Sequence, residues 1–116
     1  MTIQYKNKGY KQADTNLNTV LTCPTDATLI VKSIYCTNND ASSGILVNMN
    51  LVDSSDSNNE YEFFRDDVAA KTQVNASPQG LNLEAGDSIK IQAATASNKI
   101  QGVISYAQID RSQENG

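Results

Sequence analysis

Residues 45 to 64 read ILVNMNLVDSSDSNNEYEFF, and this stretch decides the fold. In its first part apolar side chains alternate with asparagines, so that Val47 and Met49 face one way and Asn48 and Asn50 the other. This alternation is typical of a half-buried β-strand. The polar run SSDSNN then predicts a hairpin loop, after which EYEFF returns as a second strand. The stretch therefore predicts two antiparallel strands with one apolar face.

Strand-like runs separated by turn signals continue along the chain. Residues 29 to 38, LIVKSIYCTN, carry apolar side chains on both faces, which indicates either a strand covered on both sides or a bulge partway along it. Residues 99 to 110 predict the last strand, with Gly102 as a candidate bulge. Residues 65 to 74 fit one helical turn, a loop or a short strand. The other expected strands lie at residues 18 to 24, around Leu81 and Leu83, and from residue 88 to 94.

The spacing of these runs is what an antiparallel sandwich or barrel requires, with turn signals about every eight to twelve residues. We therefore predict an all-β chain folded as a single antiparallel β-sandwich, jelly-roll or immunoglobulin-like, with about seven to eight short strands. Residues 17 to 110 are expected to form this domain, and residues 111 to 116 a polar C-terminal tail. Residues 1 to 16 predict an N-terminal arm or a short edge strand.

Composition and charge argue against several classes of function. The net charge is −4 and the isoelectric point is near 4.6, which disfavours a general affinity for nucleic acid. No apolar run approaches the length of a membrane span, and the N-terminal residues lack the apolar core of a signal peptide. We expect a protein that is made in a cytoplasm, binds no membrane or nucleic acid, and needs no cofactor.

The tripeptide Gly86-Asp87-Ser88 is the one that carries the nucleophile in one group of serine hydrolases. A serine nucleophile needs a base, usually a histidine, and this chain has no histidine. Lys90 follows closely, but nothing about the stretch suggests a buried, deprotonated lysine. Gly86 and Asp87 instead suit a tight turn that opens a strand. We interpret Ser88 as structural and expect no catalytic residues.

Two sets of potential metal ligands also have ordinary structural interpretations. Cys23 and Cys36 lack the further ligands and the spacing of a metal site. We favour two small buried thiols, while a disulfide between neighbouring strands stays open. The loop DSSDSNNE, residues 53 to 60, offers oxygen ligands but not the EF-hand spacing, so we interpret it as a solvated hairpin tip rather than a calcium site.

The order of these pieces resembles small virion structural proteins of tailed bacteriophages. It runs from TVLTCPTDATLIVKSIYCTN through an alternating strand to LNLEAGDSIKIQAA and then IQGVISYAQI, so that the match spans residues 19 to 109. Its elements are short, and the Gly-Asp turn recurs in many β domains. The resemblance implies a β-sandwich that sits in a particle as a capsid cement or decoration protein, or as a neck or tail accessory. It carries over no catalytic residues.

We therefore expect a non-enzymatic structural component of a phage virion, made in the host cytoplasm. The first expectation is a decoration or cement protein that stabilises the shell through contacts with the major capsid protein or other virion proteins, and that forms a homo-oligomer. The alternatives are a neck or tail accessory protein and a carbohydrate- or receptor-binding module on the particle. The absence of tryptophan counts against sugar binding.

The N-terminal residues supply the predicted partner-binding side chains. These are Tyr5, Lys6, Lys8, Tyr10 and Lys11, which all precede the first acidic residue of the chain. Tyrosine offers apolar area with a polar tip, and lysine offers charge complementarity to an acidic capsid surface or a neighbouring subunit. We expect this arm to be mobile in the free protein and ordered in the assembly.

Overall fold

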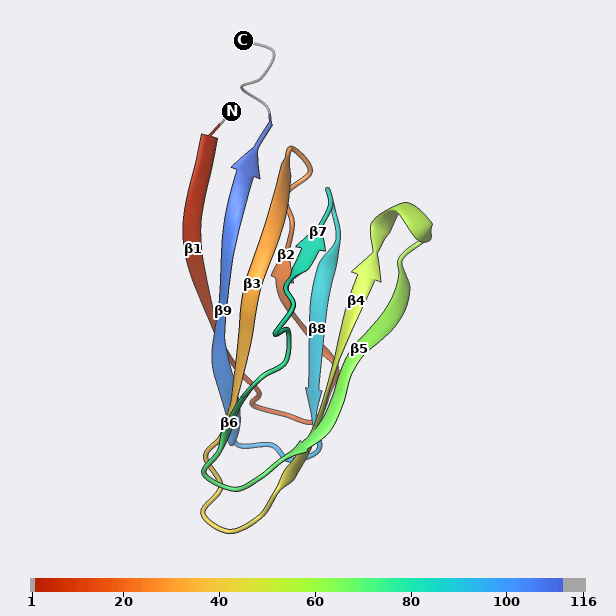
Figure 1. Ribbon diagram of the computed structural model, residues 1–116. Helices are drawn as coiled ribbons and strands as arrows, with labels where there is room; N and C mark the ends of the chain where they lie inside the picture. Colours follow the sequence, from red (N-terminus) through yellow and green to blue (C-terminus); the bar gives the residue numbers. More distant parts are fainter. Residues whose placement is uncertain (1, 112–116) are drawn as a thin grey trace.

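The computed structural model describes residues 2 to 111 and folds them into two antiparallel β-sheets packed face to face (Figure 1). The strands are β1 Thr2–Lys11, β2 Asn18–Thr22, β3 Ala27–Asn38, β4 Ile45–Asp53, β5 Asn59–Val68, β6 Gln73–Asn75, β7 Leu81–Leu83, β8 Ser88–Ala93 and β9 Ile100–Asp110. The first sheet has the order β1-β9-β3-β6, with β7 also paired with β3, and the second has the order β2-β8-β4-β5. The predicted all-β sandwich is confirmed, with nine strands in the described residues rather than seven or eight.

The helical content of residues 2 to 111 is a single 3-10 turn, η1, at Ser54–Asp56. The predicted hairpin between β4 and β5 is confirmed, and η1 forms its tip, where the sequence indicated only a loop. No helix in this part of the chain has the length and apolar character needed to cross a bilayer.

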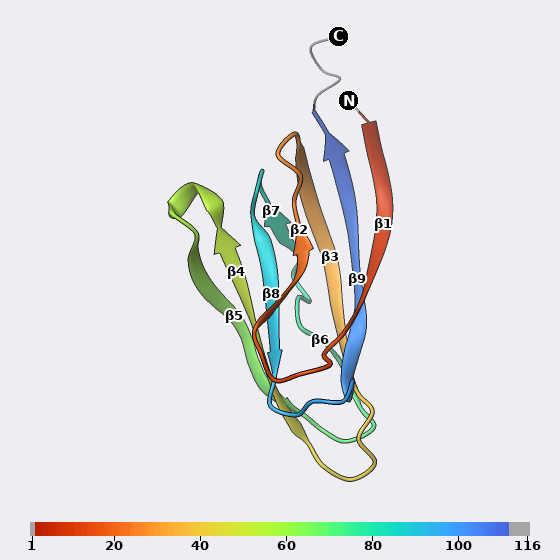
Figure 2. The same ribbon diagram turned by 180° about the vertical axis from the view of Figure 1, so that it is seen from behind.

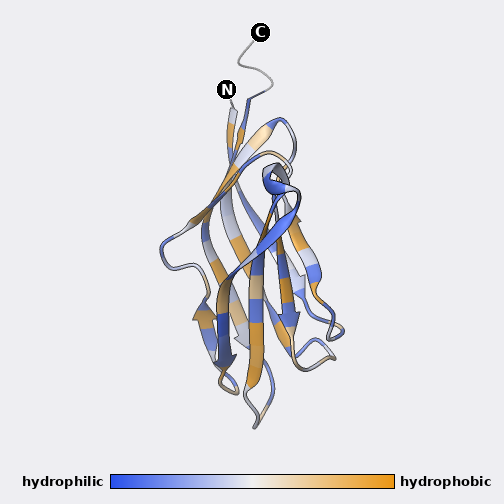
Figure 3. Cartoon of the chain, turned by 90° about the vertical axis from the view of Figure 1, so that its right-hand side faces the viewer, coloured by the Kyte–Doolittle hydropathy of each residue, from blue (hydrophilic) through white to orange (hydrophobic). Residues whose placement is uncertain are grey.

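The core lies between the two sheets and follows the predicted alternation. In β4 the side chains of Ile45, Val47 and Met49 are buried, and in β8 those of Ile89 and Ile91. Figure 3 shows the corresponding alternation of hydrophobic and hydrophilic residues along the strands. Each fully buried side chain of this size stabilises the fold by about 1.5–3 kcal/mol, so this shared interior holds the sheets together.

Strand β3 is irregular at Lys32, where its register with β9 shifts between Val31 and Ser33. Leu29 is buried before this point, and Ile34 is buried after it. The extra residue inverts the alternation, which is why apolar residues fall on both faces of an ideal strand. Of the two interpretations of this stretch, the bulge is correct.

Gly102 is not a bulge, and that prediction is wrong. The ladders of β9 run through Gly102 without a shift, pairing it with Tyr10 on β1 and with Cys36 on β3. A Cβ atom built on Gly102 would lie 1.8 Å from the Tyr35 carbonyl oxygen and 2.8 Å from the Tyr10 hydroxyl. The glycine is therefore required by a close approach rather than by a break in pairing.

The N-terminal segment is an integral strand and not a separate arm. β1 pairs with β9 along its whole length, from Thr2 opposite Asp110 to Lys11 opposite Gln101. The predicted boundary between an arm at residues 1 to 16 and a domain that starts at residue 17 is therefore wrong. The alternative prediction, an edge strand, is the one that the structure has. The sequence could not decide between the two alternatives, because almost every β1 side chain is exposed and no apolar alternation marks the strand.

Residues 65 to 74 contain no helical turn, since β5 continues to Val68 and β6 begins at Gln73. Of the expected C-terminal tail, residues 112 to 116 lie outside the described residues. Arg111 is held against β3, because its backbone N–H donates to the Asp26 carbonyl at 2.8 Å and its guanidinium donates to the Thr28 hydroxyl at 2.6 Å.

Candidate interaction surface

The Gly86-Asp87 turn connects β7 to β8 and has a structural role. Gly86 adopts a φ of 83°, and the Asp87 carboxylate is buried. One carboxylate oxygen accepts from the Ser54 backbone N–H at 3.0 Å, and the other accepts from the Glu84 N–H at 2.9 Å. Asp87 thus accepts a hydrogen bond within its own turn, in agreement with the turn interpretation, and it also joins this turn to the β4–β5 hairpin. Ser88 lies in the β8 ladder between Thr22 and Val52.

The two cysteines are buried and free, so the disulfide left open by the sequence is not formed. Burial raises the pKa of both the Cys23 and the Cys36 thiol. A thiol that resists ionisation is a weak nucleophile and a weak metal ligand. The two residues act as small core side chains, as the sequence analysis favoured.

The carboxylates of the acidic loop at residues 53 to 60 bind other groups of the same chain. Asp53 caps η1 by accepting from the Ser55 N–H at 3.1 Å, and Asp56 accepts from the Tyr61 hydroxyl. Glu60 forms an ion pair with Lys90 at 2.9 Å. Within residues 2 to 111 no group of three or more acidic or cysteine side chains is placed to hold a metal ion.

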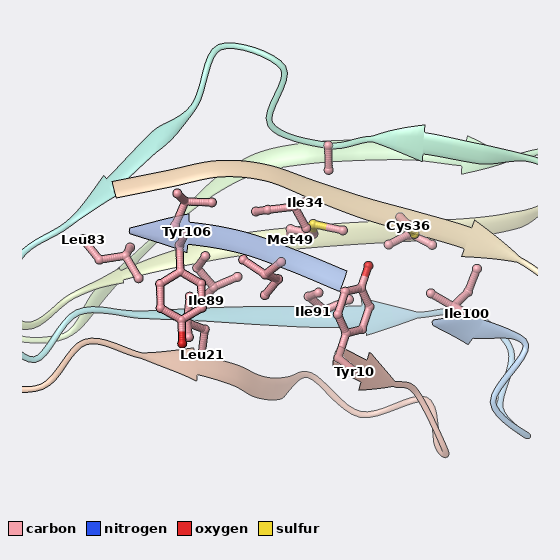
Figure 4. Close-up of a cluster of buried hydrophobic side chains, with 14 of the residues drawn as sticks. Tyr10, Leu21, Ile34, Cys36, Met49, Leu83, Ile89, Ile91, Ile100 and Tyr106 are labelled. Atoms are coloured by element: carbon pink, nitrogen blue, oxygen red, sulfur yellow. The ribbon is translucent and has the colours of Figure 1, made fainter. Parts of the chain in front are cut away.

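The predicted partner-binding side chains divide into an exposed set and one buried residue. Tyr5 is 75% exposed, and Lys6, Lys8 and Lys11 are exposed as well. Tyr10 is only 7% exposed and lies inside the core cluster (Figure 4). The prediction that Tyr10 binds a partner is therefore wrong for the folded chain.

Tyr10 is buried because its side chain extends across Gly102 to the third strand of the sheet. Its hydroxyl donates to the Tyr35 carbonyl at 2.8 Å. Burial, and next the neighbouring Cys36, raise the pKa of Tyr10 far above that of a free phenol. Tyr10 therefore stays protonated and anchors β1 to β3.

Five exposed apolar side chains lie on the outward face of the first sheet, and we call this set the outer-face patch. It consists of Ile3, Tyr5, Ile30, Tyr35 and Val103, which are 49%, 75%, 40%, 41% and 40% exposed. Within residues 2 to 111 only two other large apolar side chains are this exposed, and both lie on the second sheet. A gathering of exposed apolar side chains on one sheet face marks an interaction surface.

The strand register places these side chains in two groups, with the polar row of Asn7, Ser105 and Ser33 between them. Tyr5 and Ile30 flank Ala107 on β9, and Val103 lies beside Tyr35. The alternation of β9 sends Ile104 and Tyr106 into the core, so Val103, Ser105 and Ala107 face outward. The bulge at Lys32 then sets which β3 residues join them. Sequence reasoning missed Ile30, Tyr35 and Val103. For Ile30 and Tyr35 the reason is that the facing of β3 depends on the position of that bulge.

The outer-face patch has a basic border. Lys32 lies over the Tyr5 ring, with 4.6 Å between its ammonium nitrogen and the ring centroid. β1 and β3 contain no acidic residue, and β9 contains one, Asp110. In an acidic protein this sheet therefore offers a partner apolar side chains beside positive charge.

A shallow hollow opens at one end of the outer-face patch. It is lined by Tyr35, Thr37, Asn39, Gln73 and Gln101, together with Gly102 and Val103. An aromatic ring among amide and hydroxyl groups can hold a small polar molecule by stacking and hydrogen bonds.

Comparisons with known proteins do not assign this chain to a family. No protein-family model matches the chain, and no curated protein matches it either. The fold and the surface define a β-sandwich with exposed apolar side chains on one sheet face and Lys32 beside them.

Proposed function

We propose that the chain is a non-enzymatic structural component of a phage virion and serves as a capsid decoration or cement protein. The outer-face patch carries this proposal, because exposed apolar side chains held on one rigid sheet suit a stable protein contact. The sequence resemblance to small virion proteins supports a phage particle as the assembly to which the chain binds. A neck or tail position would use the same surface.

The patch suits docking on a shell at low entropic cost. Its side chains stand on β1, β9 and β3, which form a continuous ladder, so binding need not order a loop. Tyr5 and Tyr35 supply large contact area with few rotatable bonds. Lys11 and Lys32 add charge that would complement an acidic capsid surface.

The proposal is tested by following the chain through purification of the phage particles. We expect it to co-sediment with particles on a density gradient, at a fixed ratio to the major capsid protein measured by quantitative mass spectrometry. Recovery of the chain only in the soluble fractions would contradict the proposal.

Matched variants then test the surface. Replacing Tyr35 and Val103 by serine changes the outer-face patch, while replacing Tyr61 and Leu46 by serine changes side chains of similar exposure on the second sheet. Buried aromatic anchors commonly contribute about 2 kcal/mol or more to an interface, so we expect the first pair to reduce particle binding at least tenfold. The second pair should bind like the parent protein. Loss of binding by the second pair alone would place the contact on the other sheet.

A carbohydrate- or receptor-binding module is the second candidate, favoured by the hollow beside Tyr35. Amide side chains can bond sugar hydroxyls while a tyrosine ring packs against the sugar face. This candidate predicts that the free protein binds a glycan on an array, and that Tyr35→Ser and Gln101→Ala both abolish the signal. Particle incorporation without any glycan binding would favour the decoration role.

A further inference from the structure

Each sheet has one long edge strand, and these two strands lie at opposite sides of the sandwich; the other edges are the shorter strands β2, β6 and β7. β1 closes one side of the first sheet and β5 closes the far side of the second (Figures 1 and 2). Among the described strands, β1 pairs only with β9 and β5 only with β4. Edge strands of this kind present backbone groups that can pair with another chain. Both strands have 10 residues, so they match in length.

The side chains of these two strands carry opposite charge. β1, TIQYKNKGYK, has three lysines and no acidic residue. β5, NEYEFFRDDV, has four acidic residues and one arginine. Nearly all of these side chains are exposed, so they would meet a neighbour at either edge.

Contacts within the chain leave part of this charge without an opposite partner. Glu62 pairs with Arg65 at 2.7 Å, and Glu60 pairs with Lys90 at 2.9 Å. Asp66 and Asp67 form no ion pair within the described residues, and the same holds for the β1 lysines. The basic charge of β1 and the acidic charge of β5 disfavour pairing of β1 with β1 or of β5 with β5, because like charges would then face each other. They favour pairing of β1 with β5.

We propose that copies of this chain associate head to tail, with β1 of one copy adding to β5 of the next. The contact would continue the first sheet of one copy into the second sheet of its neighbour through a backbone ladder. Such a contact uses two different surfaces, so it leads to a closed ring or an open chain of subunits. It uses the sheet edges rather than the outer-face patch and does not depend on the proposed virion role.

Analytical ultracentrifugation of the free protein tests this association without any particle. We expect the sedimentation coefficient to rise with protein concentration at low salt, and the rise to shrink as salt screens the charges. A β1 variant with Lys6→Glu and Lys8→Glu should stay monomeric. A β5 variant with Asp66→Lys and Asp67→Lys should stay monomeric as well. The matched control changes Lys71 and Lys99, which lie in connecting loops, to glutamate and should associate like the parent.

Mixing the two monomeric variants gives the decisive result. The β1 variant keeps an acidic β5, and the β5 variant keeps a basic β1, so each edge of one variant complements an edge of the other. We expect association to return in the mixture, with melting temperatures confirming that both variants are folded. A parent protein that is monomeric at every concentration and salt level would overturn the proposal. Association of either variant alone, to the same extent as the parent, would also overturn it.

Discussion

The Tyr10 hydroxyl reaches the Tyr35 carbonyl, 2.8 Å away, by passing over Gly102 on the strand between them. This contact links three neighbouring strands, β1, β9 and β3, within one sheet. It explains why a mostly polar N-terminal segment is held as a strand. It also places Tyr10 out of reach of a partner, while Tyr5 on the same strand remains exposed.

Gly102→Ala should destabilise the fold, because the new methyl group would collide with the Tyr35 carbonyl and the Tyr10 hydroxyl. Overpacking a tight site costs about 1–3 kcal/mol, and here the first contact is rigid backbone. Gly9→Ala is the matched control, since the nearest atom to its Cβ lies 4.0 Å away. Chemical denaturation should give a lower unfolding free energy for Gly102→Ala only; equal values for both variants would contradict the described packing.

Tyr10 and Tyr5 give a matched pair on one strand. Truncating the buried Tyr10 to alanine should cost about 3–5 kcal/mol, as for other large aromatic side chains in cores. Tyr5→Ala should change stability by roughly 0.5 kcal/mol or less, since exposed positions contribute little. Thermal melts measure both effects. A Tyr10→Ala protein as stable as the parent would instead support a separate arm.

Asp87→Ala should loosen the end of the sandwich where the β4–β5 hairpin meets the β7–β8 turn. It would leave the Ser54 and Glu84 backbone N–H groups without their acceptor, at about 1–3 kcal/mol for each group left buried and unsatisfied. Asp26→Ala removes an exposed carboxylate and serves as the control. Hydrogen exchange should show faster exchange of those two amides in Asp87→Ala alone. Unchanged exchange would mean that the carboxylate does not hold the turn.

Acid should weaken the contact between Glu60 and Lys90. The hydrogen bond from Lys90, followed by that from Asn50, lowers the pKa of Glu60 below its ordinary value of 4.5. A lowered folded-state pKa means that the stabilisation is complete above the ordinary value and is lost as the pH falls through the lower one. Melting temperature measured between about pH 6 and pH 2 should therefore fall less steeply in Glu60→Gln than in the parent. Glu84→Gln removes a carboxylate that has no ion pair within the described residues and should keep the parent's steepness.

The sequence allowed the sandwich to be predicted wherever one face of a strand is buried. The β4 alternation and the Gly86-Asp87 turn both have local causes that a single sequence displays. β1 could not be recognised in this way. Its pairing depends on backbone hydrogen bonds with β9 and on Tyr10, whose hydroxyl bonds the carbonyl of Tyr35, a residue distant in the sequence. The outer-face patch was missed for a related reason, since a single extra residue at Lys32 decides which β3 side chains face outward.

A reconstruction of the phage particle by electron cryo-microscopy, at a resolution that separates strands, tests the central claim most directly. The account predicts density for this β-sandwich on the shell, with the β1-β9-β3 face and its Tyr5, Tyr35 and Val103 side chains against a neighbouring virion protein. A particle without that density would contradict the account, and so would a sandwich bound with this face open to solvent.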